Sequence, residues 1–283
     1  MAAKYRLIFI NETSKMMFTP TRKKLFKPFN AALAALLLAC TAPAWGDNKA
    51  QFQQANAAYD AGNYKQAFRL LQPLAQQGDA SSQNNLGLMY ENGLGVARNN
   101  KQAVAWYQKA AQQGHILAQF NLGNMYYNGT GVAQNYQQAF AWFQKAANQG
   151  NADAQYNLGL MYVHGRGVAQ NDKQAVAWYQ KAAQQGDVRA QNNLGIMYAE
   201  GRGVARNDKQ AAAWWQKAAQ QGDAGAQNNL AMMYAEGIGV AKNLQQAKAW
   251  WQKVLAQPDT PKNAAAKAIA RDNLEALKNN GIR

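Results

Sequence analysis

A segment of 36 residues recurs along most of this chain and constrains its fold more than any other feature. The cleanest copy runs from Asn151 to Gly186. The five copies begin at Asp79, His115, Asn151, Asp187 and Asp223. One leucine keeps its place in every copy, at Leu86, Leu122, Leu158, Leu194 and Leu230. Such a period predicts a stack of small helical or strand units, because one unit of this size cannot bury a core by itself.

Each copy has the pattern of two short amphipathic helices. Ala154, Leu158 and Met161 follow one another at spacings of four and three, as apolar residues do on one side of a helix. The second half of the copy repeats this pattern around a pair of aromatic residues. The pairs begin at Trp106, Trp142, Trp178, Trp214 and Trp250, and their phase predicts that they pack in the core or between repeats.

The ends of these helices are marked by residues that suit helix caps. Asn precedes the second helix in every copy, at Asn99, Asn135, Asn171, Asn207 and Asn243, and Asp or Asn usually precedes the first. Their side-chain oxygens can accept from the unpaired N–H groups of the first turn. Between the helices lies Gly-x-Gly-Val, whose glycines suit left-handed conformations and whose valine can anchor the loop.

The whole motif resembles the Sel-one-like repeat (SLR) family, which is related to the tetratricopeptide repeat. The resemblance rests on A-x-x-x-L-G-x-x-Y, on G-x-G-V and on W-[YFW]-x-K-A-A-x-x-G, and it covers Asp79 to Val254. It implies an all-α fold, a right-handed superhelical α-solenoid of stacked helix-turn-helix repeats that serves as a scaffold for protein partners. The last copy departs from the motif, with Ala231 replacing glycine and Val254-Leu255 replacing Ala-Ala.

The repeats divide the chain into four parts. Residues 79–255 are the five repeats, residues 47–78 resemble a tetratricopeptide unit that caps the N-terminal end, and residues 256–283 predict a C-terminal capping helix. Residues 1–46 contain a basic segment followed by the apolar run AALAALLLA, which is typical of a secretory signal peptide. Cleavage after Ala44-Trp45-Gly46 and cleavage at a lipobox before Cys40, leaving a lipidated cysteine, are both open.

The charge of the chain is strongly basic. The sequence has 30 basic and 15 acidic residues, and removal of residues 1–46 would leave 23 and 14, a net charge of about +9. One lysine recurs before the Ala-Ala pair, at Lys109, Lys145, Lys181, Lys217 and Lys253. This regular spacing favours solvated second-helix surfaces near helix C-termini over a nucleic-acid site. Export of the chain would also exclude nucleic acid as a partner.

Residues able to perform catalysis are scarce. The two histidines, His115 and His164, occupy different places in their repeats and do not predict a metal or acid–base pair. Beyond residue 46 the only serines are Ser81 and Ser82, and neither begins a Ser-x-x-Lys motif. We expect no enzyme activity and no cofactor. The family resemblance leaves a weak cell-wall or β-lactam-directed hydrolase as an alternative.

The candidate binding residues lie on the predicted first helices. An asparagine precedes each repeat leucine, at Asn85, Asn121, Asn157, Asn193 and Asn229. In tetratricopeptide proteins the matching amide lines a concave groove and holds the backbone of a bound peptide, and Phe120, Asn124 and Tyr156 fit the same groove. An amide both donates and accepts, so it can bind a peptide backbone of any sequence. Alternatively, these asparagines bond neighbouring helices and set the repeat geometry.

Together these features predict a non-catalytic scaffold that binds a protein or peptide segment. The expected location is the bacterial envelope, either the periplasm or the outer membrane, and a lipid on Cys40 would be its membrane attachment. A secreted factor that acts on a host protein is a further alternative with the same binding chemistry. The partner itself is not identified by the sequence.

Overall fold

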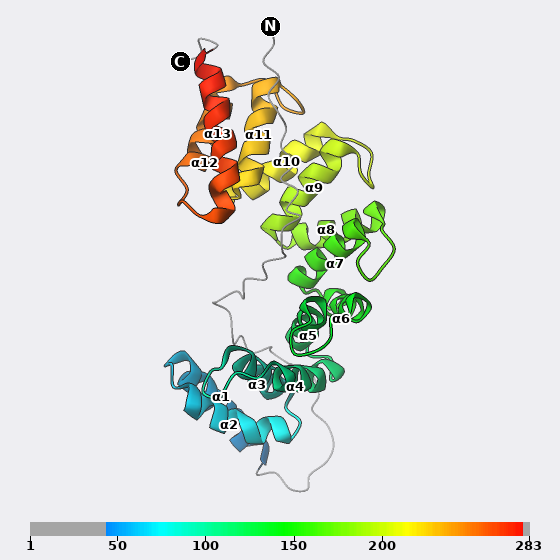
Figure 1. Ribbon diagram of the computed structural model, residues 1–283, viewed down its shortest axis with the longest axis vertical. Coiled ribbons are helices and arrows are strands. Elements are labelled where there is room, and N and C mark those ends of the chain that lie inside the picture. Colours follow the sequence, from blue (N-terminus) through cyan, green and yellow to red (C-terminus); the bar gives the residue numbers. More distant parts are fainter. Residues whose placement is uncertain (1–43, 280–283) are drawn as a thin grey trace. The chain divides into compact units, whose positions relative to one another are not determined.

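The structure is a computed structural model that describes residues 44–279, and this part of the chain contains thirteen α-helices and no strand (Figure 1). The first helices of the five repeats are α3 (Ala80–Asn92), α5 (Ile116–Asn128), α7 (Ala152–His164), α9 (Val188–Glu200) and α11 (Ala224–Glu236). The second helices are α4 (Asn100–Gln112), α6 (Tyr136–Asn148), α8 (Asp172–Gln184), α10 (Asp208–Gln220) and α12 (Leu244–Leu255). The predicted all-α repeat fold is confirmed.

The described residues form two compact units, which divide within the last turn of α6. The N-terminal unit comprises residues 44–145 and the C-terminal unit residues 146–279. Consecutive helices from α1 to α5 and from α7 to α13 pack against one another. The repeat aromatic residues lie in the cores, and the second member of each pair is almost completely buried: Tyr107, Phe143, Tyr179, Trp215 and Trp251. The predicted core position of these pairs is confirmed.

The caps and loops have the predicted local structure. Asn171 Oδ1 accepts a hydrogen bond from the backbone N–H of Gln174 at 3.0 Å, and the other Asn caps of the second helices make the same bond. The first glycine of each loop ends its helix in the left-handed conformation, as Gly165 does at φ 64°. A residue with a Cβ would be strained there. The loop valines, including Val204, are partly buried against the core.

In four of the five repeats the first helix also contains a glycine that packs against the aromatic ring of the second helix. A Cβ at Gly159 would overlap the ring of Tyr179, which lies directly against the helix backbone. The same overlap would occur between Gly195 and Trp215. The small residue therefore lets the two helices of a repeat approach closely around a large side chain. In the last repeat Ala231 holds this position, and both it and Trp251 are completely buried.

A ladder of glutamines joins successive helices, and the sequence analysis did not predict it. Gln191 is buried, and its Nε2 donates to the carbonyl oxygen of Ala183 at the end of α8, at 3.1 Å. Its Oε1 accepts from Nε2 of Gln221, which follows α10, at 2.8 Å. The buried members of the ladder are Gln83, Gln119, Gln155, Gln191 and Gln227. The carbonyl of Ala183 also accepts from the N–H of Gly186 at 3.1 Å, so the glutamine adds a second bond to it. The ladder therefore fixes each first helix to the second helix before it.

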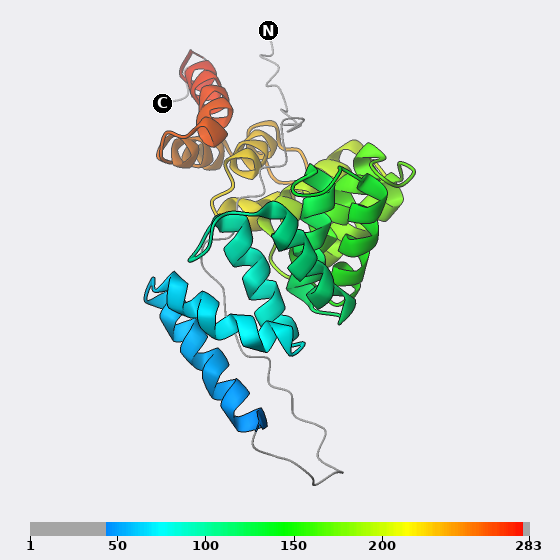
Figure 2. The same cartoon turned by 60° about the horizontal axis from the view of Figure 1, so that its bottom comes forward.

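The ends of the described chain are covered by additional helices. In the N-terminal unit, α1 (Ala44–Asp60) and α2 (Tyr64–Gln76) lie side by side (Figure 2). Phe52, Ala55 and Tyr59 of α1 form one apolar stripe that packs in the core of the capping unit. Three residues of the predicted signal peptide, 44–46, belong to α1, and the remainder, including Cys40, lies outside the described residues.

In the C-terminal unit, α13 (Pro261–Asn279) packs on α11 and α12. Ala266, Ala270 and Leu277 are buried there, with Leu274 partly buried beside them. Nδ2 of Asn228 on α11 donates to the carbonyl oxygen of Ala266 at 2.9 Å. The helix thus takes the place that the first helix of another repeat would occupy, and its outer side is exposed.

Candidate protein-binding face

The sequence-predicted residues lie on one side of the first helices, which we call the first-helix face. In the C-terminal unit this face comprises Tyr156, Asn157 and Leu160 of α7, Asn192, Asn193 and Ile196 of α9, and Asn229 and Met232 of α11. Tyr156 and Asn157 precede Leu160 by four and three residues, and Asn192 and Asn193 precede Ile196 in the same way, so each set shares one side of its helix. Contacts between α7 and α9 and between α9 and α11 bring the three helices together.

The five predicted asparagines differ in their exposure. Asn85, Asn157 and Asn229 are buried, whereas Asn121 and Asn193 are half-buried. Two of them have partners on a neighbouring helix. Nδ2 of Asn121 donates to Oδ1 of Asn84 at 3.2 Å, and Asn193 shares a hydrogen bond with the Tyr179 side chain. Asn85 accepts a longer bond, 3.4 Å, from Nδ2 of Asn84.

Asn157 is the asparagine with spare hydrogen-bonding capacity. Only 2% of its surface is exposed, and its Nδ2 has no hydrogen-bond partner among the described residues. Oδ1 of Asn192, on the next first helix, is likewise buried without a partner there. A buried amide group without a partner costs free energy, so both groups are suited to a ligand that supplies the missing bond. One offers a donor and the other an acceptor.

Tyr156 contacts both an aromatic ring and a guanidinium group of neighbouring helices. Its ring lies 5.9 Å from the ring of Tyr179, and the Arg189 guanidinium lies 4.2 Å from its centroid. Arg189 also pairs with Asp153 at 2.6 Å and with Asp187 at 2.5 Å. Burial lowers the pKa of Arg189, but the two carboxylates raise it overall above its ordinary value. The guanidinium charge is therefore already neutralised by its own neighbours.

In the N-terminal unit, Phe120 and Asn124 lie on the corresponding side of α5. Phe120 is half-buried with its ring 5.8 Å from that of Phe143. Oδ1 of Asn124 is buried and lacks a partner among the described residues. Nearby in the same helix, 45% of Leu117 is exposed, a high value for a leucine. This face therefore also combines apolar surface with an unused amide oxygen.

The last repeat does not offer the same surface. Asn228, Asn229 and Met232 of α11 are buried, because α13 lies across them. Nδ2 of Asn273 on α13 contacts Sδ of Met232 at 3.7 Å. The corresponding residues of α9, among them Ile196, are half-buried. The accessible part of the face in the C-terminal unit therefore lies on α7 and α9.

On the second-helix side, lysine side chains cover tryptophan rings of the same helix. In each repeat a lysine ammonium lies over the first aromatic ring of the pair, as Lys217 does at 4.2 Å from the Trp214 ring centroid. The other four pairs have distances between 4.0 and 4.3 Å. The sequence predicted these lysines to be solvated near helix ends. The structure adds that each one also makes a cation–π contact.

Two residues that could take part in catalysis have a structural role or are buried. Nδ1 of His115 accepts from the N–H of Ala118 at 3.2 Å and so caps α5. Ser82 is completely buried at the position that is alanine in the other repeats, which does not suit a nucleophile. Among residues 44–279 no group of three His, Cys, Asp or Glu side chains is placed to hold a metal ion. In the same residues no helix is long and apolar enough to cross a membrane.

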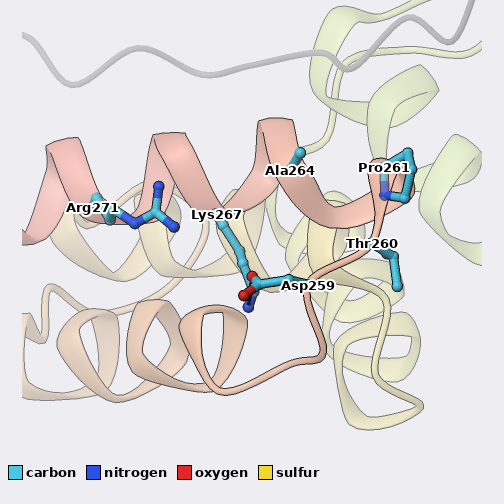
Figure 3. A pocket seen from close by; sticks show the side chains of 6 residues that line it. All are labelled: Asp259, Thr260, Pro261, Ala264, Lys267 and Arg271. Carbon is cyan, nitrogen blue, oxygen red and sulfur yellow. Dashed lines mark hydrogen bonds and ion pairs between the residues drawn. The ribbon is translucent and has the colours of Figure 1, made fainter.

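A shallow pocket lies at the start of α13, where Lys267 pairs with Asp259 at 2.6 Å (Figure 3). The hydrogen bond from Lys267, together with its charge, lowers the pKa of the Asp259 carboxyl. Only 7% of the Lys267 side chain is exposed, so its ammonium is occupied by this contact. The pair holds the turn that precedes the capping helix, and the pocket is part of the C-terminal cap.

Stacked helix pairs define this protein as an α-helical repeat protein. The chain belongs to the Sel1 repeat family. The family model matches residues 56–79, 80–115, 116–151, 152–187, 188–223 and 224–257. These are six segments against the five predicted, and the additional one covers most of the N-terminal capping unit, which lacks the long Gly-x-Gly-Val loop.

Two solved structures extend this result. A protective antigen present in uropathogenic Escherichia coli strains, which displays an SLR fold, is 38% identical with a TM-score of 0.77. The match covers 84% of this chain but only 50% of that one. A Sel1 repeat protein from Oxalobacter formigenes is 33% identical with a TM-score of 0.68, over 78% of this chain and 96% of that one. No curated protein is a significant match. The fold that these proteins share is commonly a non-catalytic scaffold for protein–protein interactions.

Proposed function

We propose that this protein is a non-catalytic scaffold of the bacterial envelope and that its first-helix face binds a segment of a protein partner. The partner's backbone would pair with the free amide groups of Asn157 and Asn192, and its apolar side chains would cover Leu160 and Ile196. Scaffolding needs no cofactor and no nucleic acid. No contact in the structure favours the hydrolase alternative.

The observation that carries this proposal is the contrast between the two sides of the C-terminal unit. On the second-helix side, a lysine covers the first aromatic ring of each repeat. On the first-helix side, Leu160 and Ile196 are only partly buried and Asn157 keeps an unpaired donor. Apolar surface beside unsatisfied polar groups is typical of a binding site rather than of a finished surface.

The affinity of such a site would come mainly from its apolar part. Net hydrogen bonds to a peptide contribute about 0.5–1.5 kcal/mol each. Ordering a flexible segment costs about 2–5 kcal/mol. Two or three amide contacts therefore only balance the ordering cost. Covering Leu160, Ile196 and the edge of Tyr156 supplies the remainder, which makes these side chains the residues to probe.

The envelope location rests on the N-terminal sequence. A basic segment precedes an apolar run that is too short to span a bilayer, as in a secretory signal peptide. The similar protein from uropathogenic Escherichia coli is a protective antigen, which agrees with export. Cleavage after Gly46 would release a soluble protein, whereas lipidation of Cys40 would attach it to a membrane.

Site-specific photocrosslinking in the native cell tests the binding face. A photoreactive residue at Ile196 on α9 is compared with one at Ala177, which is exposed on α8. We expect a discrete crosslinked band from Ile196 and none from Ala177. Equal labelling of the two positions would contradict binding at the first-helix face. Fractionation of the same cells, with and without residues 1–46, tests the location; retention of the full chain in the cytoplasm would contradict export.

A further inference from the structure

The second helices carry charge of almost one sign. The second-helix layer consists of α2, α4, α6, α8, α10 and α12, and its eleven bases, all exposed except the half-buried Lys248, are Lys65, Arg69, Lys101, Lys109, Lys145, Lys173, Lys181, Lys209, Lys217, Lys248 and Lys253. The same six helices contain two acids, Asp172 and Asp208. The first helices of the repeats with their caps have one base, Arg189, and seven acids: Asp79, Glu91, Asp153, Asp187, Glu200, Asp223 and Glu236. The two layers therefore have opposite charge.

The acids of the second-helix layer are neutralised from the loops. Asp172 pairs with Arg202 at 3.1 Å, and Asp208 pairs with Arg206 at 3.0 Å. Further bases of the same loops are Arg98, Arg166 and Lys242. Within residues 44–279, none of the eleven bases of the layer has an ion pair of 4.0 Å or less. Their charge is therefore not compensated by contacts inside the protein.

The acids of the first helices are too distant to cancel this charge. Packed helix axes lie about 8–10 Å apart, and the exposed sides of the two layers point away from each other. The Debye length in physiological salt is about 8 Å. A ligand on the second-helix layer therefore interacts mainly with the bases of that layer.

Three lysines of the layer lie where helix electrostatics disfavours them. Lys101, Lys173 and Lys209 are in the first turns of α4, α8 and α10, near the positive ends of the helix dipoles. The first turn of α4 contains no acid that could offset its lysine. In α8 and α10 the neighbouring aspartate is already paired with a loop arginine. A local rule broken in three repeats indicates a functional reason.

The exposed lysines form strips that suit a broad surface. On α8, Lys173, Ala177 and Lys181 are exposed at spacings of four, so they share one side of the helix. The equivalent strip on α10 is Lys209, Ala213 and Lys217. The two lysines of a strip are eight residues apart, roughly 12 Å along the axis, too far to hold one small anion together. The alanine between them leaves no bulky side chain that would keep a flat surface away.

The tryptophans of the layer direct this contact toward charged groups. Lys181 lies 4.0 Å from the Trp178 ring centroid, and Lys217 lies 4.2 Å from that of Trp214. A ring is neutral, so it holds each ammonium in place without cancelling its charge. Trp178 is buried and Trp214 half-buried, so neither extends far from the surface. Contact through this layer is therefore with headgroups and not with acyl chains.

We propose that the second-helix layer docks on the surface of a membrane that contains anionic phospholipids. The lysines at both ends of α4, α8 and α10 interact with separate lipid phosphates, and the strips between them lie against the headgroups. Each lysine close to such a surface strengthens binding about fivefold, so several weak contacts add up to a stable attachment. This inference goes beyond the proposed function and does not rest on binding at the first-helix face, which belongs to the other layer.

Sedimentation with lipid vesicles tests the proposal. The protein, purified from cells that express the full coding sequence, is mixed with vesicles of phosphatidylcholine alone or of phosphatidylcholine and phosphatidylglycerol in equal parts. We expect binding that requires phosphatidylglycerol and decreases at high salt. A lipid on Cys40 would bind both kinds of vesicle equally, so the difference between them reports the charge contact. Equal binding to both vesicles, or none to either, would overturn the proposal.

The variant Lys101→Gln/Lys173→Gln/Lys209→Gln removes three exposed lysines that make no ring contact, and circular dichroism checks its fold. Its binding to the anionic vesicles should be at least about tenfold weaker. The matched control, Lys49→Gln/Arg271→Gln/Lys278→Gln, removes three exposed bases of α1 and α13 and should change binding by less than about threefold. An equal loss in both variants would contradict docking by this layer.

An anionic polysaccharide is the alternative partner that the same experiment separates. Retention on immobilised heparin that the three substitutions abolish, without binding to the phosphatidylglycerol vesicles, would overturn membrane docking. Photocrosslinking at Ile196 does not depend on either result, because that residue lies on the first-helix face. Failure of this proposal and failure of the proposed function are therefore distinguishable.

Discussion

The first and second helices of the C-terminal unit are 12 or 13 residues long and three of each kind are present, but they differ in their side chains. Second helices carry a lysine in the last turn that covers a tryptophan of the same helix, and α8 and α10 bury an aromatic ring against a glycine of the preceding helix. First helices leave apolar side chains half-exposed and end in glutamate in two of three cases. The difference indicates that one layer supplies stability and the other is available for recognition.

The largest expected difference concerns two tyrosines of one repeat. Tyr179 on α8 is 1% exposed, and Tyr179→Ala should lower the free energy of unfolding by about 3–5 kcal/mol, the usual cost of deleting a buried aromatic ring. Tyr156→Ala on α7 removes a half-buried ring and should cost about 1 kcal/mol. Urea unfolding of both variants measures this. Equal costs would show that the first-helix side is also a stability element.

The glutamine ladder should give the next largest effect. Gln191→Ala removes the two hydrogen bonds that the Gln191 amide makes to the carbonyl of Ala183 and to Nε2 of Gln221, and should cost about 1–3 kcal/mol. The control is Gln210→Ala on the exposed side of α10, which should change stability by less than about 0.5 kcal/mol. The midpoints of urea unfolding of the two variants measure this difference in stability. If Gln191→Ala matched its control, the ladder would not hold the repeats together.

A smaller effect is expected from the lysines that cover the tryptophans. Lys217→Ala removes a cation 4.2 Å from the Trp214 ring centroid and should cost about 0.5–1 kcal/mol. Lys209→Ala, from the exposed start of the same helix, removes the same charge without a ring contact. Thermal unfolding compares them, and tryptophan fluorescence should shift only for Lys217→Ala. The same loss in both variants would attribute the effect to net charge.

The smallest effect is pH-dependent and concerns the one first helix that is capped by histidine. Burial lowers the pKa of His115, partly opposed by the charge of Asp79, so the folded state favours the neutral ring that accepts from Ala118. Stability from this cap is present above the unfolded-state pKa of about 6.5 and is lost as the pH falls below it. His115→Asn keeps the cap at every pH. Urea midpoints at pH 7.5 and 5 should therefore differ less in this variant.

His164 is a second histidine whose effect on the pH dependence can be compared with that of His115. Burial, with the nearby charges of Arg166 and Arg202, also lowers its pKa, so it contributes a loss of the same sign. His164→Gln should reduce the pH dependence without changing the cap of α5. A His115→Asn variant whose midpoint fell as much as that of the unchanged protein would show that the histidine cap does not respond to pH.

Much of the fold could be predicted because its determinants are local. The caps depend on Asn and Asp a few residues from the N–H groups they bind, and the loop depends on glycines that adopt a left-handed backbone. The period of the repeat predicted two helices per copy, and the named caps marked where the second helices begin. The histidine cap of α5 could also be predicted, because His115 occupies the position that Asp79 and Asn151 have in their copies.

The glutamine ladder was missed although a signal was available. Gln191 and Gln221 keep their places in all five copies, as the asparagines do. Their bonds, however, connect residues 30 positions apart and a carbonyl on the preceding helix. Sequence alone does not show which of several repeated amides turns inward. The candidate site has the same limitation, because five equivalent asparagines have five different sets of neighbours.

The sequence by itself determined that this protein is an all-α stack of 36-residue helix pairs with a basic net charge and few groups able to perform catalysis. Only the tertiary structure decided which residues of α11 the predicted capping helix covers, and that Asn157 keeps an unpaired donor. The physical reason is that equivalent residues of a repeat have the same local sequence, whereas their exposure and their hydrogen bonds depend on neighbouring helices that are far away along the chain.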